Sequence, residues 1–294
     1  MLNVIKMRKV TLGLSLLLVI ASIVLFFVRG LNLDVDFTGG TTVYINIGQE
    51  FNNDDIAAVV KDAIGVDAST IQKSGETEQE VVIKVRSLST EERAKLFDAV
   101  AEKYDLKDDA LLQVDNVDAT VGKELSRSAV ISSVIAIVLM LLYISIRFEF
   151  FSGLAAIYSL AQNVIILVGI YSLFQLPVNT TFIAAILTIL GYSINDTIVI
   201  FDRIRENDRT MKKTPFSEVA NISVNQSVTR SINTSVTTLI TIVVLFILGV
   251  SSIRQFALPI IIGVAIGTFS SLFIATPIWW MIRGDGKNVV KAKK

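Results

Sequence analysis

The chain has 294 residues, of which 52% are hydrophobic and 18% are charged, and its formal net charge is zero. A soluble domain carries about 25% charged residues, so this composition, with a mean hydropathy of +0.62, excludes an ordinary soluble protein and indicates a polytopic membrane protein. Because the sequence has neither cysteine nor histidine, thiol chemistry, disulfides and the usual zinc and haem ligands are excluded, and no metal site is expected.

The first apolar run covers Val10–Val28 and follows a short basic tail at Met1–Lys9. A signal peptide would have a shorter apolar core of about 7–15 residues and a cleavage site of small residues. This run is longer and ends in Phe26, Phe27, Val28 and Arg29. We therefore expect an uncleaved membrane anchor, with residues 1–29 forming the tail and the first span.

Residues 30–127 are predicted to form a soluble domain, because they hold 20 of the 27 acidic residues but only 10 of the 27 basic ones. Val81, Ile83 and Val85 alternate with their neighbours in the period-2 pattern of a half-buried strand. Ser89 or Thr90 as an N-cap, followed by acidic residues in the first turn, is typical of a helix start. The predicted order is strand, helix, strand, strand, helix, strand, which is the order of an α+β, ferredoxin-like (βαββαβ) sandwich. The expected elements are Thr42–Ile47, Asn53–Ile64, Ser69–Lys73, Glu80–Arg86, Thr90–Tyr104 and Leu111–Val121.

Five further apolar runs, each close to the ~20 residues that cross a bilayer, are expected between residues 128 and 282. With the first run they predict a polytopic α-helical membrane protein of six transmembrane helices. A charged segment at 202–230 is expected to join the fourth and fifth spans, and a basic tail is expected at 283–294. The five runs are Ser128–Ile146, Leu154–Phe174, Thr180–Phe201, Ser231–Val250 and Leu258–Ile282.

Lysine and arginine in short loops predict the orientation in the membrane. The basic tails and the segment at 202–230 fall on one side, whereas the loop at 175–179 has no basic residue. We expect a multi-pass protein of the cytoplasmic (inner) membrane, with both termini in the cytoplasm and residues 30–127 outside it.

Asp196 lies inside the fourth apolar run, six residues before the next charged residue, Asp202. A carboxylate within a membrane span is costly and marks a functional site unless it only bonds neighbouring helices. Asn195 and Thr197 flank it, which suggests a helix face toward protein or water. An acid that alternates between a desolvated and a charge-paired environment could carry protons.

Arg230, at the start of the fifth span, is the candidate partner of Asp196, although an arginine at a span end also fits the membrane interface. Hydroxyl and amide side chains follow it at Ser231, Asn233 and Thr234, and such a polar half-span indicates a bundle interior or a wet cavity. The two spans are antiparallel, so a contact between Asp196 and Arg230 is possible. The sequence does not decide it.

Three other motifs favour structural roles. The charged cluster of Asp202, Arg203, Arg205 and Glu206 is expected to be a cytoplasmic helix end. Asp36, Gly39 and Gly40 are expected to form a tight turn after the first span, because paired glycines permit unusual φ angles. Gly263 and Gly267 form a GxxxG pattern that favours helix packing. No nucleotide-binding loop or catalytic motif is present, so an enzyme is not expected.

Four segments together resemble the SecD/SecF family of the bacterial Sec protein-export machinery, on its SecF side, within the resistance-nodulation-division superfamily. They are VDFTGGT at 35–41, GYSINDTIVIFDRIRE at 191–206, TRSINTS at 229–235 and IIGVAIGTFSSLFIA at 261–275. The resemblance covers essentially the whole chain, and the second segment is the most specific.

The resemblance implies an auxiliary translocation subunit that uses the proton motive force, with protons as the coupling ion and no cofactor. It implies a 1:1 pairing with a SecD-like chain, contact with the SecYEG channel, the translocating preprotein and the lipid bilayer, and no nucleic-acid partner. It assigns proton coupling to Asp196 and Arg230. The SecD-side acid is absent, because Asn195 stands at its position, so half of the coupling site is expected from another chain.

Two alternatives remain open. One is half of a proton-coupled exporter of small molecules or lipids in the same superfamily, against which the single small external domain argues. The other is a scaffold of the translocation channel that uses no energy, in which Asp196 would be structural.

Overall fold

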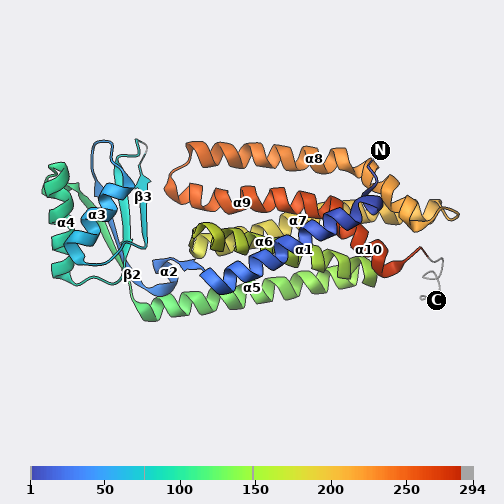
Figure 1. Ribbon diagram of the computed structural model, residues 1–294, viewed down its shortest axis with the longest axis horizontal. Helices are drawn as coiled ribbons and strands as arrows, with labels where there is room; N and C mark the ends of the chain where they lie inside the picture. The colour runs from blue at the N-terminus through green and yellow to red at the C-terminus, as the bar shows by residue number, and fades with distance from the viewer. Residues whose placement is uncertain (1, 76, 148, 286–294) are drawn as a thin grey trace.

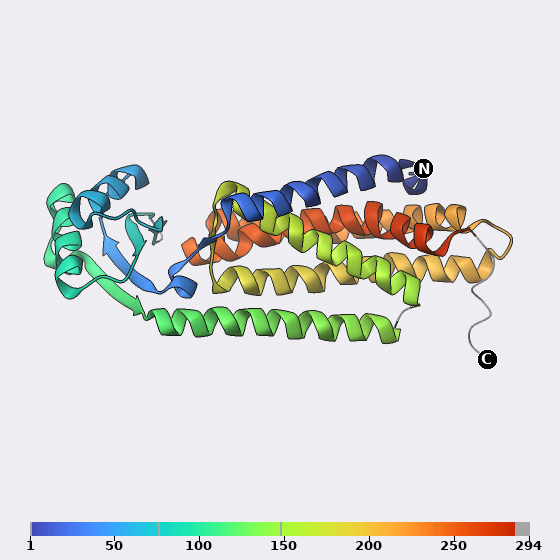
Figure 2. The same ribbon diagram turned by 60° about the horizontal axis from the view of Figure 1, so that its bottom comes forward.

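The computed structural model describes residues 2–75, 77–147 and 149–285 (Figure 1). Six helices in this part of the chain are long and apolar enough to cross a membrane, which confirms the predicted spans. They run side by side along the long axis, and the soluble domain lies at one end (Figures 1 and 2). The helices are α1 Val4–Arg29, α5 Ala119–Arg147, α6 Phe150–Phe174, α7 Thr180–Thr210, α8 Phe216–Leu248 and α9 Ser251–Ser270, the last continued by the π-helical turn η2 Ser271–Ala275 and by α10 Thr276–Arg283.

The soluble domain contains the predicted order of elements. Its hydrophobic core is formed by side chains of one four-stranded sheet and of the two helices packed on it. The strand order is β3-β4-β2-β5, and all neighbouring strands are antiparallel. Ser89 and Glu92 form the capping box that starts α4. The elements are β2 Gly40–Asn46, α3 Asn53–Ile64, β3 Thr70–Ser74, β4 Glu80–Val85, α4 Thr90–Tyr104, the 3₁₀ turn η1 Asp108–Ala110 and β5 Leu111–Val117.

The boundary between the domain and the second span lies earlier than predicted. Strand β5 ends at Val117 and α5 begins at Ala119, whereas the sequence placed a strand to Val121 and the span from Ser128. The Thr120 hydroxyl and, at 2.7 Å, the Thr120 backbone N–H both donate hydrogen bonds to Asp118, and they hold the pKa of its carboxyl below the usual range. The start of α5 was not recognised in the sequence because its first turns are polar. An apolar run marks only the part of a helix within the hydrocarbon.

The charged segment at 202–230 is almost entirely helical, which corrects its interpretation as a connecting segment. Helix α7 passes through Asp202–Glu206 and ends at Thr210, and α8 begins at Phe216. The four charged residues are therefore not a helix end, which lies about one turn beyond Glu206. Their charge suggested an exit into water, but polar residues with good helix propensity let the helix continue past the membrane. The basic tail, from residue 286 on, lies outside the described residues.

The segment after α1 anchors the domain to the bundle. Strand β1 Asn32–Leu33 pairs in parallel with β6 Pro177–Val178, and α2 Val35–Thr38 forms a single turn. Gly39 and Gly40 follow with φ of 76° and 159°, which confirms the predicted tight turn. A Cβ on Gly40 would lie 2.3 Å from a backbone oxygen of β4, so only glycine fits this close approach.

Candidate functional site

Asp196 lies in the middle of the bundle, on the part of α7 that faces α8 and η2. Its side chain is 9% exposed. Ser231 of α8 donates a hydrogen bond of 2.5 Å to Oδ1 of Asp196. The other oxygen, Oδ2, is buried and has no hydrogen-bond partner among the described residues. A buried polar atom without a partner is rare and costly in a native structure, so this carboxylate is a place where a proton or a water would bind.

Further polar side chains surround Asp196 and line a buried seam between α6, α7 and α9. Thr197 and Ser271 share a hydrogen bond of 2.8 Å. Ser270, which directly precedes Ser271 in the chain, pairs with Ser159 of α6 at the same distance. Such hydroxyl pairs hold membrane helices together where no water can compete.

Asn163 of α6 adds an unsatisfied amide to this seam. Its side chain is 2% exposed, and neither its oxygen nor its nitrogen has a partner among the described residues. The Ser193 hydroxyl on α7 is likewise buried and unpartnered. The sequence analysis did not identify Asn163 or Ser271 as part of the site. They could have been found in the sequence as polar residues inside apolar spans.

Close packing of α9 against α7 brings this seam together. A Cβ on Gly263 would lie 2.4 Å from the Ile189 side chain, and one on Gly267 would lie 2.3 Å from Ser193 Oγ. The GxxxG pattern is therefore a packing contact, as predicted. The helix then widens into the π-helical turn η2 at Ser271, and such turns often occur at functional sites.

Arg230 does not contact Asp196 directly. Among the described residues no salt bridge joins the two, and Arg230 is exposed on α8 while its neighbour Ser231 points into the bundle. The predicted lining divides in the same way. Thr197 and Ser231 are buried beside Asp196, whereas Asn195, Asn233 and Thr234 are exposed on the surface of the chain.

The charged cluster on α7 bonds to its own helix and to α8. Arg203 pairs with Glu206 at 2.7 Å, and Arg205 pairs with Asp202 at 3.3 Å. Arg203 also donates to Gln226 of α8 at 2.7 Å. These exposed pairs support the helical extension of α7, each by a few tenths of a kcal/mol.

Helix α9 links the polar seam to the soluble domain. At its start, Gln255 accepts a hydrogen bond of 2.6 Å from Asn179 and donates to Gln72 of β3. Arg254 pairs with Glu78 on the turn between β3 and β4. The far end of α9 carries Ser270, directly before η2. One helix thus contacts the domain at one end and the surroundings of Asp196 at the other.

The segment between α1 and the domain makes a second link. Asp34 is 1% exposed and pairs with Lys84 of β4 at 2.6 Å. Asp36 accepts hydrogen bonds from the backbone and the hydroxyl of Thr180, at 3.1 and 2.8 Å, at the start of α7. The predicted turn residue Asp36 thereby holds the beginning of the helix that carries Asp196.

This fold and site define a polytopic helical membrane protein with a small α+β domain and a buried carboxylate inside its helical bundle. The family described as "Protein export membrane protein SecD/SecF, C-terminal" matches residues 97–285. The chain belongs to this SecD/SecF family of protein-export membrane proteins, as the sequence motifs predicted.

Similar proteins come from several bacteria. The protein translocase subunit SecF of Dictyoglomus turgidum is 37% identical over 93% of both chains. The subunit SecDF of Bacillus subtilis is 37% identical over 94% of this chain but only 37% of its own. A crystal structure of SecDF from Thermus thermophilus, described as a translocon-associated membrane protein, superposes with a TM-score of 0.84 at 34% identity, over 96% of this chain and 38% of that one. The chain therefore spans well under half the length of these SecDF proteins.

Proposed function

We propose that this protein is the SecF-like subunit of a SecD–SecF assembly that assists Sec-dependent protein export by using the proton motive force. In this proposal the chain catalyses no covalent reaction and needs no cofactor, and protons are the coupling ion. The observation that carries the proposal is Asp196, a buried carboxylate with one oxygen bound by Ser231 and the other unpartnered.

The exposed face of α8 supports a partner chain inside the membrane. Arg230, Asn233, Thr234 and Thr237 are all exposed on this helix, although it is long and apolar enough to span a bilayer. Charged and amide side chains are costly against lipid. A SecD-like chain packed 1:1 against this face would cover them, and the SecDF relatives carry additional sequence on the same polypeptide that would do so. Arg230 would then face the partner's half of the coupling site.

Protonation of Asp196 would be transmitted to the domain by helix movement. A neutral carboxyl no longer needs the Ser231 contact, so α8 and α9 are free to shift against α7. Because α9 bonds Gln72 and Glu78 of the domain through its first residues, such a shift would reach the ferredoxin-like domain. We place that domain outside the cytoplasmic membrane, where it would act on the preprotein leaving the SecYEG channel, with both termini in the cytoplasm.

The test is the variant Asp196→Asn at wild-type membrane levels, with export of a preprotein measured in vesicles with and without an uncoupler. Asp202→Asn is the matched control, because Asp202 lies on the same helix and is exposed. We expect Asp196→Asn to lose the uncoupler-sensitive part of export and Asp202→Asn to keep it. Full uncoupler-sensitive export by Asp196→Asn would reject the proton role and leave a scaffold.

A further inference from the structure

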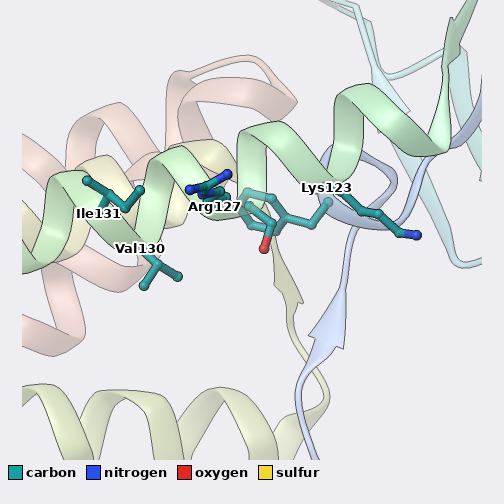
Figure 3. A pocket seen from close by; sticks show the side chains of 6 residues that line it. Lys123, Arg127, Val130 and Ile131 are labelled. Atoms are coloured by element: carbon teal, nitrogen blue, oxygen red, sulfur yellow. The ribbon is translucent and has the colours of Figure 1, made fainter.

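An open pocket lies where α5 meets the turn α2, at the domain end of the helical bundle (Figure 3). Its volume is about 410 Å³. The lining residues are Phe37, Lys123, Ser126, Arg127, Val130 and Ile131. All except Phe37 lie on α5, which runs along the edge of the bundle (Figures 1 and 2).

Backbone packing fixes the shape of this pocket. A Cβ on Gly122 of α5 would lie 2.9 Å from the Gly39 backbone nitrogen and 3.0 Å from the Phe37 backbone oxygen. The turn α2 is therefore held directly against the first turns of α5. Phe37 is only 8% exposed and packs into the core between the helices, so it forms a fixed wall.

The pocket carries two positive charges, Lys123 and Arg127, for which no ion pair exists among the described residues, although Glu124 lies between them in sequence. Lys123 and Arg127 are both exposed and lie one turn apart, so they share a face of α5. Among the described residues neither forms a salt bridge with a carboxylate, and neither donates a hydrogen bond to a protein acceptor. Figure 3 shows the two side chains on neighbouring turns of α5, with Val130 and Ile131 beyond Arg127. An arginine and a lysine at this spacing suit a phosphate group.

The depth of these residues points to an amphipathic ligand. From Arg127 to Ile144 the helix rises roughly 26 Å, which is most of the ~30 Å hydrocarbon layer. With Ile144 near the opposite surface, Lys123 and Arg127 would lie at the headgroup level on the side of the soluble domain. Val130 and Ile131 lie one turn deeper and are 61% and 46% exposed.

A second, separate cavity lies farther along α5, between this helix and α6. Its volume is about 290 Å³, and every lining side chain is apolar. Ile137 and Leu141 contribute from α5, and the opposite wall comes from α6 with Leu190 of α7. A basic site at the headgroup level and an apolar cavity below it match the two ends of a phospholipid.

We propose that this face of α5 binds one anionic phospholipid, with its phosphate on Lys123 and Arg127 and an acyl chain along Val130 and Ile131 toward the apolar cavity. The site would hold the start of α5 and the turn α2 at the membrane surface. The proposal does not depend on the export role or on which side of the membrane carries the soluble domain.

Native mass spectrometry of the full chain, extracted from membranes and titrated with phosphatidylglycerol or phosphatidylcholine, tests the proposal. Each basic residue near an anionic headgroup strengthens binding roughly fivefold, so K123Q/R127Q is expected to weaken phosphatidylglycerol binding by about 30-fold. Phosphatidylcholine binding should not change. Wild-type phosphatidylglycerol affinity in K123Q/R127Q would overturn the proposal.

Three further arms separate the explanations. K212Q/K213Q removes two exposed lysines from the loop between α7 and α8 and should bind as the wild type does, whereas an equal loss would mean only a general charge effect and would overturn the site. K123R/R127K keeps both charges and should retain binding, which excludes misfolding as the cause. Glycerol phosphate, which has no acyl chain, should not displace the lipid. Displacement of phosphatidylglycerol by an equal concentration of glycerol phosphate would show that the site binds a free phosphate, and it would overturn the proposal. Loss of the lipid whenever a second protein chain is co-extracted would show that a protein covers this face, and it would overturn the proposal as well.

Discussion

Ser231 donates a hydrogen bond of 2.5 Å to Asp196, whereas its neighbour Arg230 is exposed and forms no salt bridge with this carboxylate among the described residues. Within this chain, the candidate site therefore pairs an acid with a hydroxyl. The arginine is turned toward the surface, where the proposed partner would lie. Ser231 and Arg230 are adjacent in sequence, but only Ser231 contacts the buried carboxylate, whereas Arg230 is exposed.

Replacing Ser231 by alanine should weaken proton-dependent export without unfolding the bundle. A hydrogen bond to a charged acceptor contributes about 1.5–3 kcal/mol, so we expect at least a tenfold loss of the uncoupler-sensitive export rate. Ser235→Ala is the control, since Ser235 is also buried on α8 but pairs with Thr268 at 2.6 Å. Equal losses in both variants would indicate a packing defect in place of a specific role.

Arg230→Met should affect the assembly and leave the isolated chain stable. Arg230 is exposed, and no salt bridge to it exists among the described residues, so its removal breaks no ion pair there. Thermal unfolding of the purified chain should stay within about 0.5 kcal/mol of the wild type, as for other surface substitutions. Uncoupler-sensitive export with the SecD-like partner should be lost. A large loss of stability in the chain alone would contradict this assignment.

The sequence predicted the elements whose signal is local. Asn53–Ile64 and Thr90–Tyr104 have the predicted bounds, because caps and apolar stripes mark both helices. The ends of α5 and α7 were misplaced, because polar turns extend a helix beyond the membrane without changing its apolar run. The hydrophobic pattern marks the part of a helix inside the membrane, and it does not show how far the helix continues outside it.

The site was only partly visible in the sequence for a related reason. Asp196 is a charge in an apolar run, so it could be found directly. The contacts of Ser271 and Asn163 depend on how α6 and η2 pack against α7, which no local pattern encodes. The same holds for Arg230, because one helical position, about 100° of rotation, decides whether a residue faces the bundle or its surface.

The ion pair of Asp34 with Lys84 should be important for the stability of the soluble domain. The Asp34 side chain is fully buried, so Lys84→Met would leave an unpaired buried carboxylate and cost about 3–5 kcal/mol. Lys61→Met is the control, because Lys61 and Asp67 are 63% and 79% exposed and such pairs contribute under about 1 kcal/mol. Chemical unfolding followed by the circular dichroism of the full chain measures both. Similar losses in the two variants would count against a special role for Asp34.

The acid stability of the same domain should depend on Glu92. Hydrogen bonds from Arg86 and Ser89 lower the pKa of this carboxyl from 4.5 to about 2. Its folded pKa is depressed, so its stabilising contribution is present above pH 4.5 and is lost as the pH falls toward 2. Glu92→Gln should make the free energy of unfolding depend less on pH in that window. At neutral pH the free energy of unfolding should change only by the small contribution of the lost ion pair. High salt should reduce the difference, because the pair is at the surface. An unchanged acid limb would show that other carboxyls dominate it.

Gly267→Ala should separate α9 from α7 and so perturb the polar seam beside Asp196. The added Cβ would lie 2.3 Å from Ser193 Oγ and 3.3 Å from Ser193 Cβ, and Ser193 is itself buried, so the hydroxyl must rotate and the helices must give way. Overpacking of this kind costs about 1–3 kcal/mol. Gly191→Ala is the matched control within the bundle, because a Cβ there meets no atom within 4 Å. Thermal unfolding in detergent should show a lower midpoint for Gly267→Ala and an unchanged or higher one for Gly191→Ala, since alanine is the better helix former. If Gly267→Ala were as stable as the wild type, the close approach of α9 to α7 would not be required for the fold, and its effect on uncoupler-sensitive export could then be measured directly.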